Sequence, residues 1–225
     1  MNQVAVGYEV VRRHVADAAD HAGRTPDSVR IVAVTKHVGV PEVTEALDAG
    51  IIDLGENRVQ EFIGKYGLFP HARWHFIGSL QTNKVKDIVG KTHLIHSVDR
   101  VKLLHHIEQS ATAAGVVQAV LLQVNVSGED SKHGFLTRDV ADVLSEASQM
   151  DSVEVKGFMT MAPYQRPEDV RWVFRELREL RDSLRTEGPN GVELGELSMG
   201  MTNDYRVAVE EGATIVRIGR AIFGK

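Results

Sequence analysis

Short runs rich in β-branched and other apolar residues recur along the whole chain, with helix-like apolar patterns between them. Eight runs predict strands, over residues 29–36, 51–55, 74–78, 93–98, 119–126, 155–161, 196–200 and 215–219. The connections are long enough to hold a helix, which allows neighbouring strands to run parallel. We therefore predict an α/β fold in which residues 1–225 form one (βα)8 barrel of the TIM type, in preference to an open doubly wound sheet.

The helical pattern is clearest after Pro167, a residue that suits a first helical position, and its apolar stripe continues to Leu184. The chain printed here ends at Lys225, too soon after the eighth strand for a full last helix. A second apolar stripe at helical spacing covers residues 4–22, before the first strand. We expect this extra N-terminal helix to cover the gap beside the eighth strand.

Composition excludes several classes of function. The chain contains no cysteine, so disulfides, thiolate metal sites and thiol nucleophiles are excluded, and a reducing compartment fits. No stretch approaches the ~20 apolar residues of a membrane span. The net charge is −5 and the basic residues are scattered, which argues against a nucleic-acid partner. Neither a dinucleotide-binding nor a P-loop motif is present. We expect a cytoplasmic protein.

Lys36 is the first candidate for chemistry, because barrels of this type carry their working groups at the C-terminal ends of the strands. Lys36 ends the first apolar run. An ammonium at the mouth of a buried strand is costly to desolvate, so it loses its proton more readily there and the amine can attack a carbonyl group. The alternative is that Lys36 simply points into solvent.

Glycines mark the exits of the seventh and eighth strands, at Gly200 and Gly219. The loops after these two strands commonly bind phosphate in this architecture, and glycine lets backbone N–H groups approach a ligand. A helix expected near Asn203 would add further N–H groups. Asp204 would repel a phosphate, so we expect it to point outward. Glycines also occur at strand ends for steric reasons alone, and that alternative stays open.

Arg217 alternates with Val216 and Ile218, which predicts that it points into the barrel. Its partner there is either an acid such as Asp53 or a ligand ring or carboxylate. Asn57 and His75 lie near strand exits as candidate polar groups, and we expect His75 to be structural.

Two pairs of histidines are not expected to form a metal site. His105 and His106 are neighbours on a predicted helix and point apart, and His93 and His96 lie in a predicted strand, so neither pair has the spacing of a coherent metal-binding set. We expect these histidines at the surface.

Five motifs, in order along nearly the whole chain, carry a specific family resemblance. They are Ala33-Val34-Thr35-Lys36, Gly55-Glu56-Asn57-Arg58-Val59-Gln60-Glu61, Trp74-His75-Phe76-Ile77-Gly78 with Leu80-Gln81-Thr82-Asn83-Lys84, Ser198-Met199-Gly200-Met201 with Asp204, and Arg217-Ile218-Gly219 with Ile222-Phe223-Gly224. This sequence resembles the pyridoxal 5′-phosphate homeostasis proteins. The resemblance implies a fold similar to the N-terminal barrel of alanine racemase, without that enzyme's second, all-β domain.

The resemblance also implies roles for individual residues. Lys36 would hold pyridoxal 5′-phosphate as an internal aldimine, Asn57 would lie beside the cofactor and Arg217 would face the pyridine nitrogen. The phosphate would bind at Ser198, Gly200 and Gly219. Arg220 departs from the family pattern, which usually has Ser or Thr at this position. A hydroxyl donor is lost there, and a guanidinium that can pair with the same phosphate is gained.

The implied function is vitamin B6 homeostasis, in which the protein buffers the cofactor or delivers it to apo-enzymes without catalytic turnover. We expect a monomer. One alternative is an amino-acid racemase, and another is a Schiff-base aldolase that uses Lys36 on a sugar phosphate. A racemase needs a second proton carrier opposite the lysine. Of the four tyrosines, only Tyr164 and Tyr205 are placed where they could reach the barrel mouth.

Overall fold

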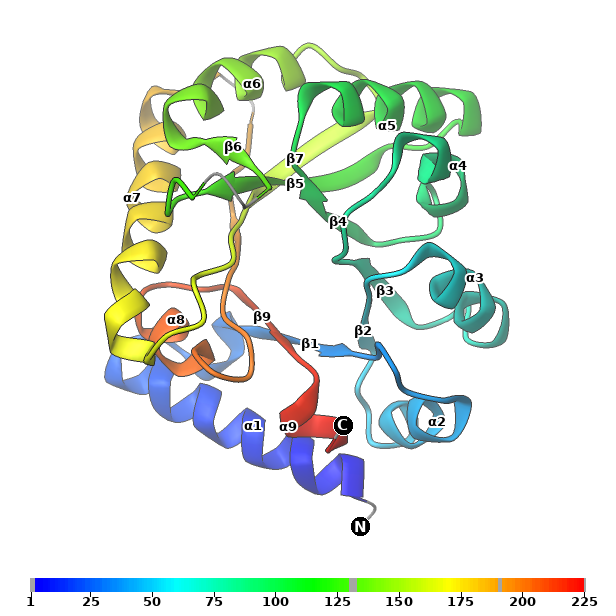
Figure 1. Cartoon of the computed structure of the whole chain (residues 1–225), viewed down its shortest axis with the longest axis vertical. Coiled ribbons are helices and arrows are strands. Elements are labelled where there is room, and N and C mark those ends of the chain that lie inside the picture. The colour runs from blue at the N-terminus through cyan, green and yellow to red at the C-terminus, as the bar shows by residue number, and fades with distance from the viewer. Residues whose placement is uncertain (1–2, 130–132, 190–191, 225) are drawn as a thin grey trace.

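The computed structural model describes residues 3–129, 133–189 and 192–224, and within these ranges the sheet strands are all parallel (Figure 1). The barrel strands are β1 (Arg30–Val34), β2 (Asp53–Glu56), β3 (Arg73–Phe76), β4 (Leu94–Val98), β5 (Gln118–Asn125), β7 (Val153–Met159), β8 (Glu196–Ser198) and β9 (Ile215–Ile218). They pair in the order β4-β3-β2-β1-β9-β8-β7-β5, and the β4–β5 pairing closes the ring. The predicted (βα)8 barrel is confirmed.

One strand was not predicted. β6 (Phe135–Leu136) pairs with Val124 and Asn125 at the end of β5, outside the ring of eight. A strand of two residues is too short to show an alternating apolar pattern, so hydrophobic periodicity does not detect it.

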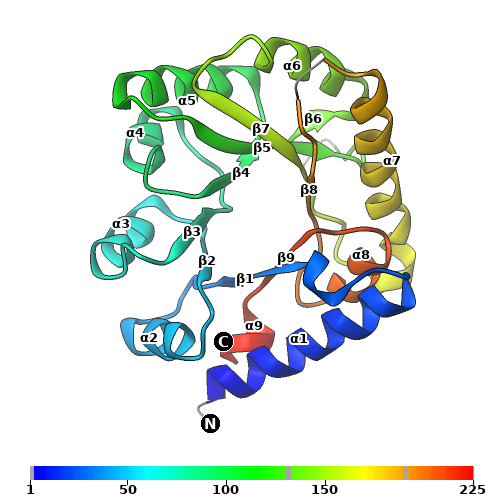
Figure 2. The same cartoon turned by 180° about the vertical axis from the view of Figure 1, so that it is seen from behind.

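The helices surround the barrel, and their apolar faces pack on the outside of the strands (Figures 1 and 2). The outer helices are α2 (Val40–Asp48), α3 (Val59–Leu68), α4 (Val85–Ile88), α5 (Val101–Ala114), α6 (Val140–Ala147), α7 (Arg171–Glu187) and α8 (Tyr205–Glu210). Short 3-10 turns occur at η1 (Pro26–Ser28), η2 (Thr82–Lys84), η3 (Thr137–Asp139) and η4 (Pro167–Val170), and η4 leads directly into α7. No helix in the described ranges combines the length and the apolar character that crossing a bilayer requires.

The N-terminal helix α1 (Gln3–His21) packs along α8 and the short final helix α9 (Arg220–Phe223), beside β9 (Figure 2). It buries the apolar stripe predicted from the sequence, including Val4, Val11 and Val15. A four-residue α9 cannot cover the last strand alone, and α1 supplies the missing surface.

The barrel interior contains a small apolar layer, separate from the main core between strands and helices. Its buried members are Val32, Leu94, Leu121, Met159 and Ile215. The remaining interior positions are largely polar, and they lead to the C-terminal end of the strands, where the candidate site lies.

Candidate functional site

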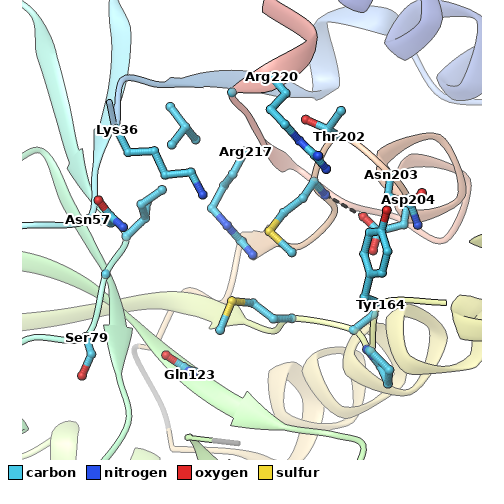
Figure 3. Close-up of a pocket in the computed structure, with 18 of the residues that line it drawn as sticks. Lys36, Asn57, Ser79, Gln123, Tyr164, Thr202, Asn203, Asp204, Arg217 and Arg220 are labelled. Carbon is cyan, nitrogen blue, oxygen red and sulfur yellow. Dashed lines mark hydrogen bonds between the residues drawn. The ribbon is translucent and has the colours of Figure 1, made fainter. Parts of the chain in front are cut away.

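A cavity of about 370 Å³ opens at the C-terminal ends of the barrel strands, a volume within the usual range for small-molecule sites (Figure 3). Five of the residues predicted for the site line it: Lys36, Asn57, Arg217, Gly219 and Arg220. Two others, Ser198 and Gly200, lie outside the lining. The side chains of Lys36, Arg217 and Arg220 point toward the centre of the cavity (Figure 3).

Lys36 follows β1 and points into the cavity from an exposed turn. The next residue, His37, has a φ of 61° and is the only non-glycine residue with positive φ in the described chain. Left-handed backbone is costly for such a residue, and it persists where surrounding structure fixes it. Among the described residues, the Lys36 amine has no hydrogen-bond or ion-pair partner. Lys36 is therefore a free amine in the cavity.

A buried ion pair anchors the backbone beside Lys36. Lys65, from α3, donates a hydrogen bond of 2.7 Å to the carbonyl oxygen of Thr35 and also pairs with Glu56. The Thr35 hydroxyl donates to the same Glu56 carboxylate over 2.8 Å. The second carboxylate oxygen accepts a hydrogen bond of 3.2 Å from the backbone N–H of Asn57. Glu56 and Lys65 thus fix the exits of β1 and β2 relative to each other.

Asn57 brings an unused acceptor to the cavity. Its Oδ1 is the one buried side-chain polar atom without a hydrogen-bond partner in the described chain. A buried acceptor left without a partner costs free energy, so it indicates a missing donor. The backbone of Asn57 touches the next strand exit, because a Cβ added at Gly78 would lie 2.0 Å from the Asn57 carbonyl oxygen. Only glycine permits this contact.

The loop after β8 forms the opposite wall, with Thr202 and Asp204 (Figure 3). The expectation that Asp204 points outward is wrong: Asp204 is buried, and its Oδ1 accepts a hydrogen bond of 2.7 Å from the Met201 N–H. This bond closes the turn and offsets part of the desolvation cost. Burial raises the pKa of the Asp204 carboxyl, although the Met201 N–H and the charge of Arg217 oppose the shift. Gly200 supports the turn with a φ of +92°.

Arg217 lies in β9 and points inward, as predicted from strand alternation. Its guanidinium donates to the Ser198 carbonyl over 2.8 Å, to the Ser198 hydroxyl over 2.6 Å and to the Thr160 carbonyl over 3.0 Å. Burial lowers its pKa to about 10, against the opposing charge of Asp204, so it remains a cation at neutral pH. Asp53, the acid suggested from the sequence, instead forms a bidentate pair with Arg73.

Two buried histidines extend from Ser198 through the barrel interior. His96 Nδ1 lies 2.8 Å from the Ser198 hydroxyl, and His96 Nε2 lies 2.9 Å from His75 Nδ1. His75 Nε2 lies 2.9 Å from Asp53 Oδ1. The expectation that His96 lies at the surface is wrong, because strand pleating turns it inward and leaves it 0% exposed.

Burial favours the neutral form of both imidazoles in this series. Burial lowers the pKa of His75, although the hydrogen bond with Asp53 opposes the shift. Burial, followed by the charges of His75 and Arg217, lowers the pKa of His96 well below its ordinary value. Burial raises the pKa of the Asp53 carboxyl, but the hydrogen bonds from His75 and Arg73 outweigh it and lower that pKa to about 2.

The cavity lining also includes one tyrosine and two methionines. Tyr164 is 84% exposed, and Met161 and Met201 are partly exposed as well. Tyr205 does not reach the cavity, because it is buried at the start of α8 and its hydroxyl lies 2.8 Å from His14 Nδ1 of α1.

The chain matches known proteins over nearly its whole length. The sequence model of the family described as alanine racemase, N-terminal domain, matches residues 8–225. The pyridoxal phosphate homeostasis protein of Aquifex aeolicus (strain VF5) is 44% identical over 218 residues, which cover 96% of this chain and 95% of that protein. This chain belongs to the pyridoxal phosphate homeostasis protein family.

Solved structures place the family on the same barrel. PipY of Synechococcus elongatus PCC7942, in the structure with PLP bound, has a TM-score of 0.82 and 33% identity, and the match covers 93% of this chain and 100% of that one. Alanine racemase of Clostridium difficile 630 has a TM-score of 0.71 at 14% identity, over 94% of this chain and 55% of that one. The second likeness concerns the fold alone.

The residues in the cavity fit the ligand in the family's name. A free lysine amine can react with an aldehyde, and guanidinium groups suit a phosphate. The basic residues Lys36, Arg217 and Arg220 outnumber the one lining carboxylate, Asp204. The unpartnered Asn57 oxygen can accept a hydrogen bond from a ligand hydroxyl or protonated nitrogen.

The sequence did not single out Thr202 or Lys65. Thr202 lies among the glycine and methionine residues after β8, where the strand-exit rule points to the loop without choosing a side chain. Lys65 reaches Thr35 from a helix thirty positions along the chain, a contact without a sequence signal. His96 could have been found by applying to β4 the alternation that identified Arg217 in β9.

Proposed function

We propose that this chain binds pyridoxal 5′-phosphate and holds it covalently through Lys36, as a cytoplasmic protein that buffers the cofactor and delivers it to apo-enzymes. One observation carries the proposal: the unpartnered Lys36 amine shares one cavity with Arg217 and Arg220, and no carboxylate pairs with any of these groups in the described chain. The family and the PLP-bound PipY structure support the choice of ligand.

Each lining residue has a proposed task. Lys36 supplies the nitrogen that condenses with the aldehyde: a C=N bond forms and one water leaves. Arg217 donates to the ring end, and Asn57 Oδ1 accepts from a ligand donor. Thr202, Gly219 and Arg220 bind the phosphate, and the left-handed turn at Gly200 shapes the loop after β8 that carries Thr202. Ser198 lies behind Arg217 and is treated separately below.

We further propose that the chain has no substantial catalytic turnover. When bound, pyridoxal phosphate supplies an aldehyde and a conjugated ring that is a full electron sink if an acid keeps its nitrogen protonated. Arg217 is a donor only and cannot take that role. For a second proton carrier, the cavity offers Tyr164, whose side chain is 84% exposed and is held by no described hydrogen bond. Among the described residues that line the cavity, Asp204 is the one carboxylate, and it is bound to the Met201 N–H.

The attachment is tested by incubating the protein with pyridoxal 5′-phosphate, reducing with borohydride and mapping the labelled peptides. We expect the pyridoxyl group on the peptide that contains Lys36. Lys36→Ala should lose the label, and Lys91→Ala, which alters an exposed lysine away from the cavity, should keep it. Label distributed over other lysines in the unmodified chain would contradict the assignment.

Turnover is tested separately, in deuterated water, with the holo-protein and a panel of L-amino acids. We expect no sustained formation of D-amino acid. Steady formation of a D-amino acid that disappears in the Tyr164→Phe variant would contradict this proposal and would show that the protein is a racemase.

A further inference from the structure

Four buried side chains join Arg217 to the opposite end of the barrel. From Arg217 the contacts pass to Ser198 over 2.6 Å, to His96 over 2.8 Å, to His75 over 2.9 Å and to Asp53 over 2.9 Å. Ser198, His96 and His75 are each 0% exposed, and Asp53 is 7% exposed. These four residues, here called the interior chain, lie beyond the cavity lining and have no task in the proposed function.

The two ends of the series together set the direction of every hydrogen in the interior chain. At one end the Arg217 guanidinium only donates, so the Ser198 oxygen accepts from it. At the other end the Asp53 carboxylate only accepts, so a neutral His75 donates Nε2–H to it and accepts at Nδ1. A neutral His96 that donates to His75 accepts at Nδ1, and the hydrogen it accepts there is that of the Ser198 hydroxyl. His96 then carries its hydrogen on Nε2 and donates to His75 Nδ1. His75 in turn carries its hydrogen on Nε2 and donates to the Asp53 carboxylate, which also binds Arg73. All links are satisfied with both imidazoles neutral.

We propose that Ser198, His96, His75 and Asp53 are positioning residues for Arg217: a one-way series of hydrogen bonds that holds the guanidinium so that its remaining N–H groups face the ring end of the bound ligand. This inference rests on the proposed function. Three of the five N–H groups of Arg217 are used by Ser198 and Thr160, and two remain for a ligand. The single hydrogen of the Ser198 hydroxyl goes to His96 in this series, so Ser198 has no donor left for a phosphate.

Packing alone does not explain the interior chain. The neighbouring layer of the same barrel is filled by Val32, Leu94, Leu121, Met159 and Ile215, so apolar residues can occupy this interior. Polar groups placed there cost free energy unless every one is paired. The series is fully paired and ends at the one arginine that lines the cavity from inside a strand.

The direction of the hydrogen bonds in the interior chain is tested first. Long-range 1H–15N correlation spectra of the full protein without ligand report which nitrogen of each histidine ring carries the hydrogen. His75 and His96 should both show a protonated Nε2 and an unprotonated Nδ1 at neutral pH. Either ring found as the Nδ1–H tautomer or as a cation would overturn the one-way series. This measurement does not depend on cofactor binding, so it remains decisive if the proposed function fails.

The positioning role is tested with Ser198→Ala, and Thr202→Val is the matched control in the cavity wall. Affinities for pyridoxal 5′-phosphate and for unphosphorylated pyridoxal are measured by absorbance titration. Ser198→Ala should lower the affinities for both ligands by a similar factor, about tenfold for one lost hydrogen bond to a charged group. It should also shift the wavelength of the visible band of the bound ligand. Thr202→Val should weaken only the phosphorylated ligand and leave the band in place.

Two outcomes would overturn the positioning role. Loss confined to the phosphorylated ligand in Ser198→Ala would make Ser198 a phosphate ligand, and unchanged affinities with an unshifted band would make the series irrelevant to the site. His96→Gln serves as a second variant, because it breaks the series one residue further from Arg217. It should shift the band in the same direction as Ser198→Ala, and an unshifted band in a folded variant would also count against the proposal.

Discussion

Cations at the base of the barrel are paired with acids, whereas the basic residues that line the cavity at its mouth are not. At the base, Arg30 and Arg73 begin β1 and β3 and pair with acids that begin other strands: Arg30 lies 3.2 Å from Glu196 of β8, across β9, and Arg73 makes a bidentate contact with Asp53 of the neighbouring β2. At the mouth, Lys36 and Arg220 have no acidic partner among the described residues, and Arg217 bonds only to neutral oxygens.

The difference separates structural charges from charges kept for a ligand. The paired cations at the base link one strand to another, and each is balanced by its acidic partner. Unpaired cations around one cavity repel one another, and an anionic ligand relieves that repulsion. A ligand that binds the folded chain but not the unfolded chain also stabilises the fold. The mouth is therefore the part of the molecule whose stability should depend on a phosphorylated ligand.

The largest effect should come from Lys36→Ala. The variant should bind pyridoxal 5′-phosphate without the visible band of a covalent lysine adduct, because the attacking amine is gone. The fold should persist, since Lys36 is exposed and its loss opens little core volume. Circular dichroism and an absorbance spectrum check the two statements. A full-strength band in this variant would show that another lysine reacts.

Lys65→Met should be the most destabilising change at the mouth. It leaves Glu56 buried without its cation, and breaking a buried ion pair costs on the order of 3–5 kcal/mol. Chemical denaturation measures the loss. The double variant Lys65→Met with Glu56→Gln, which removes both charges, should recover part of it. A single variant as stable as the wild type would mean that this pair does not anchor the exits of β1 and β2.

Arg220→Ala should lower the affinity for pyridoxal 5′-phosphate and leave the affinity for pyridoxal unchanged. Loss of a charge-assisted contact is worth about 1.5–3 kcal/mol, which corresponds to roughly ten- to a hundredfold in affinity. Pyridoxal should bind as before, because it lacks the phosphate. Arg220→Lys keeps the charge and should restore much of the affinity. If Arg220→Ala binds both ligands like the wild type, Arg220 does not contact the phosphate.

The smallest effect should come from the base, with Glu196→Gln. The pair with Arg30 is partly exposed, so its loss should cost less than about 1 kcal/mol, and glutamine can still accept from the Thr214 hydroxyl. Titration should give an unchanged affinity for pyridoxal 5′-phosphate. An affinity change as large as that of Arg220→Ala would remove the distinction between the two ends.

Much of this architecture could be predicted from the sequence, because strand and helix periodicity depends on local residues. Eight alternating runs predicted the barrel, the strand-end rule located Lys36 and alternation oriented Arg217 inward. The same alternation, applied to β4, turns His96 inward, whereas its spacing from His93 bears only on metal binding and gives no orientation. The inward position of His96 was therefore predictable from the sequence, and the expectation of a surface histidine was wrong for that reason.

Other features depend on contacts that no local pattern encodes. Asp204 is buried because the turn after β8 brings the Met201 N–H to its carboxylate, a loop geometry that charge arguments alone did not anticipate. Lys65 acts across two elements, and the two-residue β6 exists only as a partner of β5. Tertiary structure decides each of these.

The central claim is that the mouth holds a phosphorylated aldehyde through Lys36 and the unpaired cations. The most direct test is a titration of the purified chain with pyridoxal 5′-phosphate and with pyridoxal, followed by absorbance before and after borohydride. We expect a visible band that borohydride bleaches, with the phosphorylated ligand bound at least about tenfold more tightly, since its phosphate makes at least one charge-assisted contact. Equal affinities, or no visible band at saturation, would contradict the account.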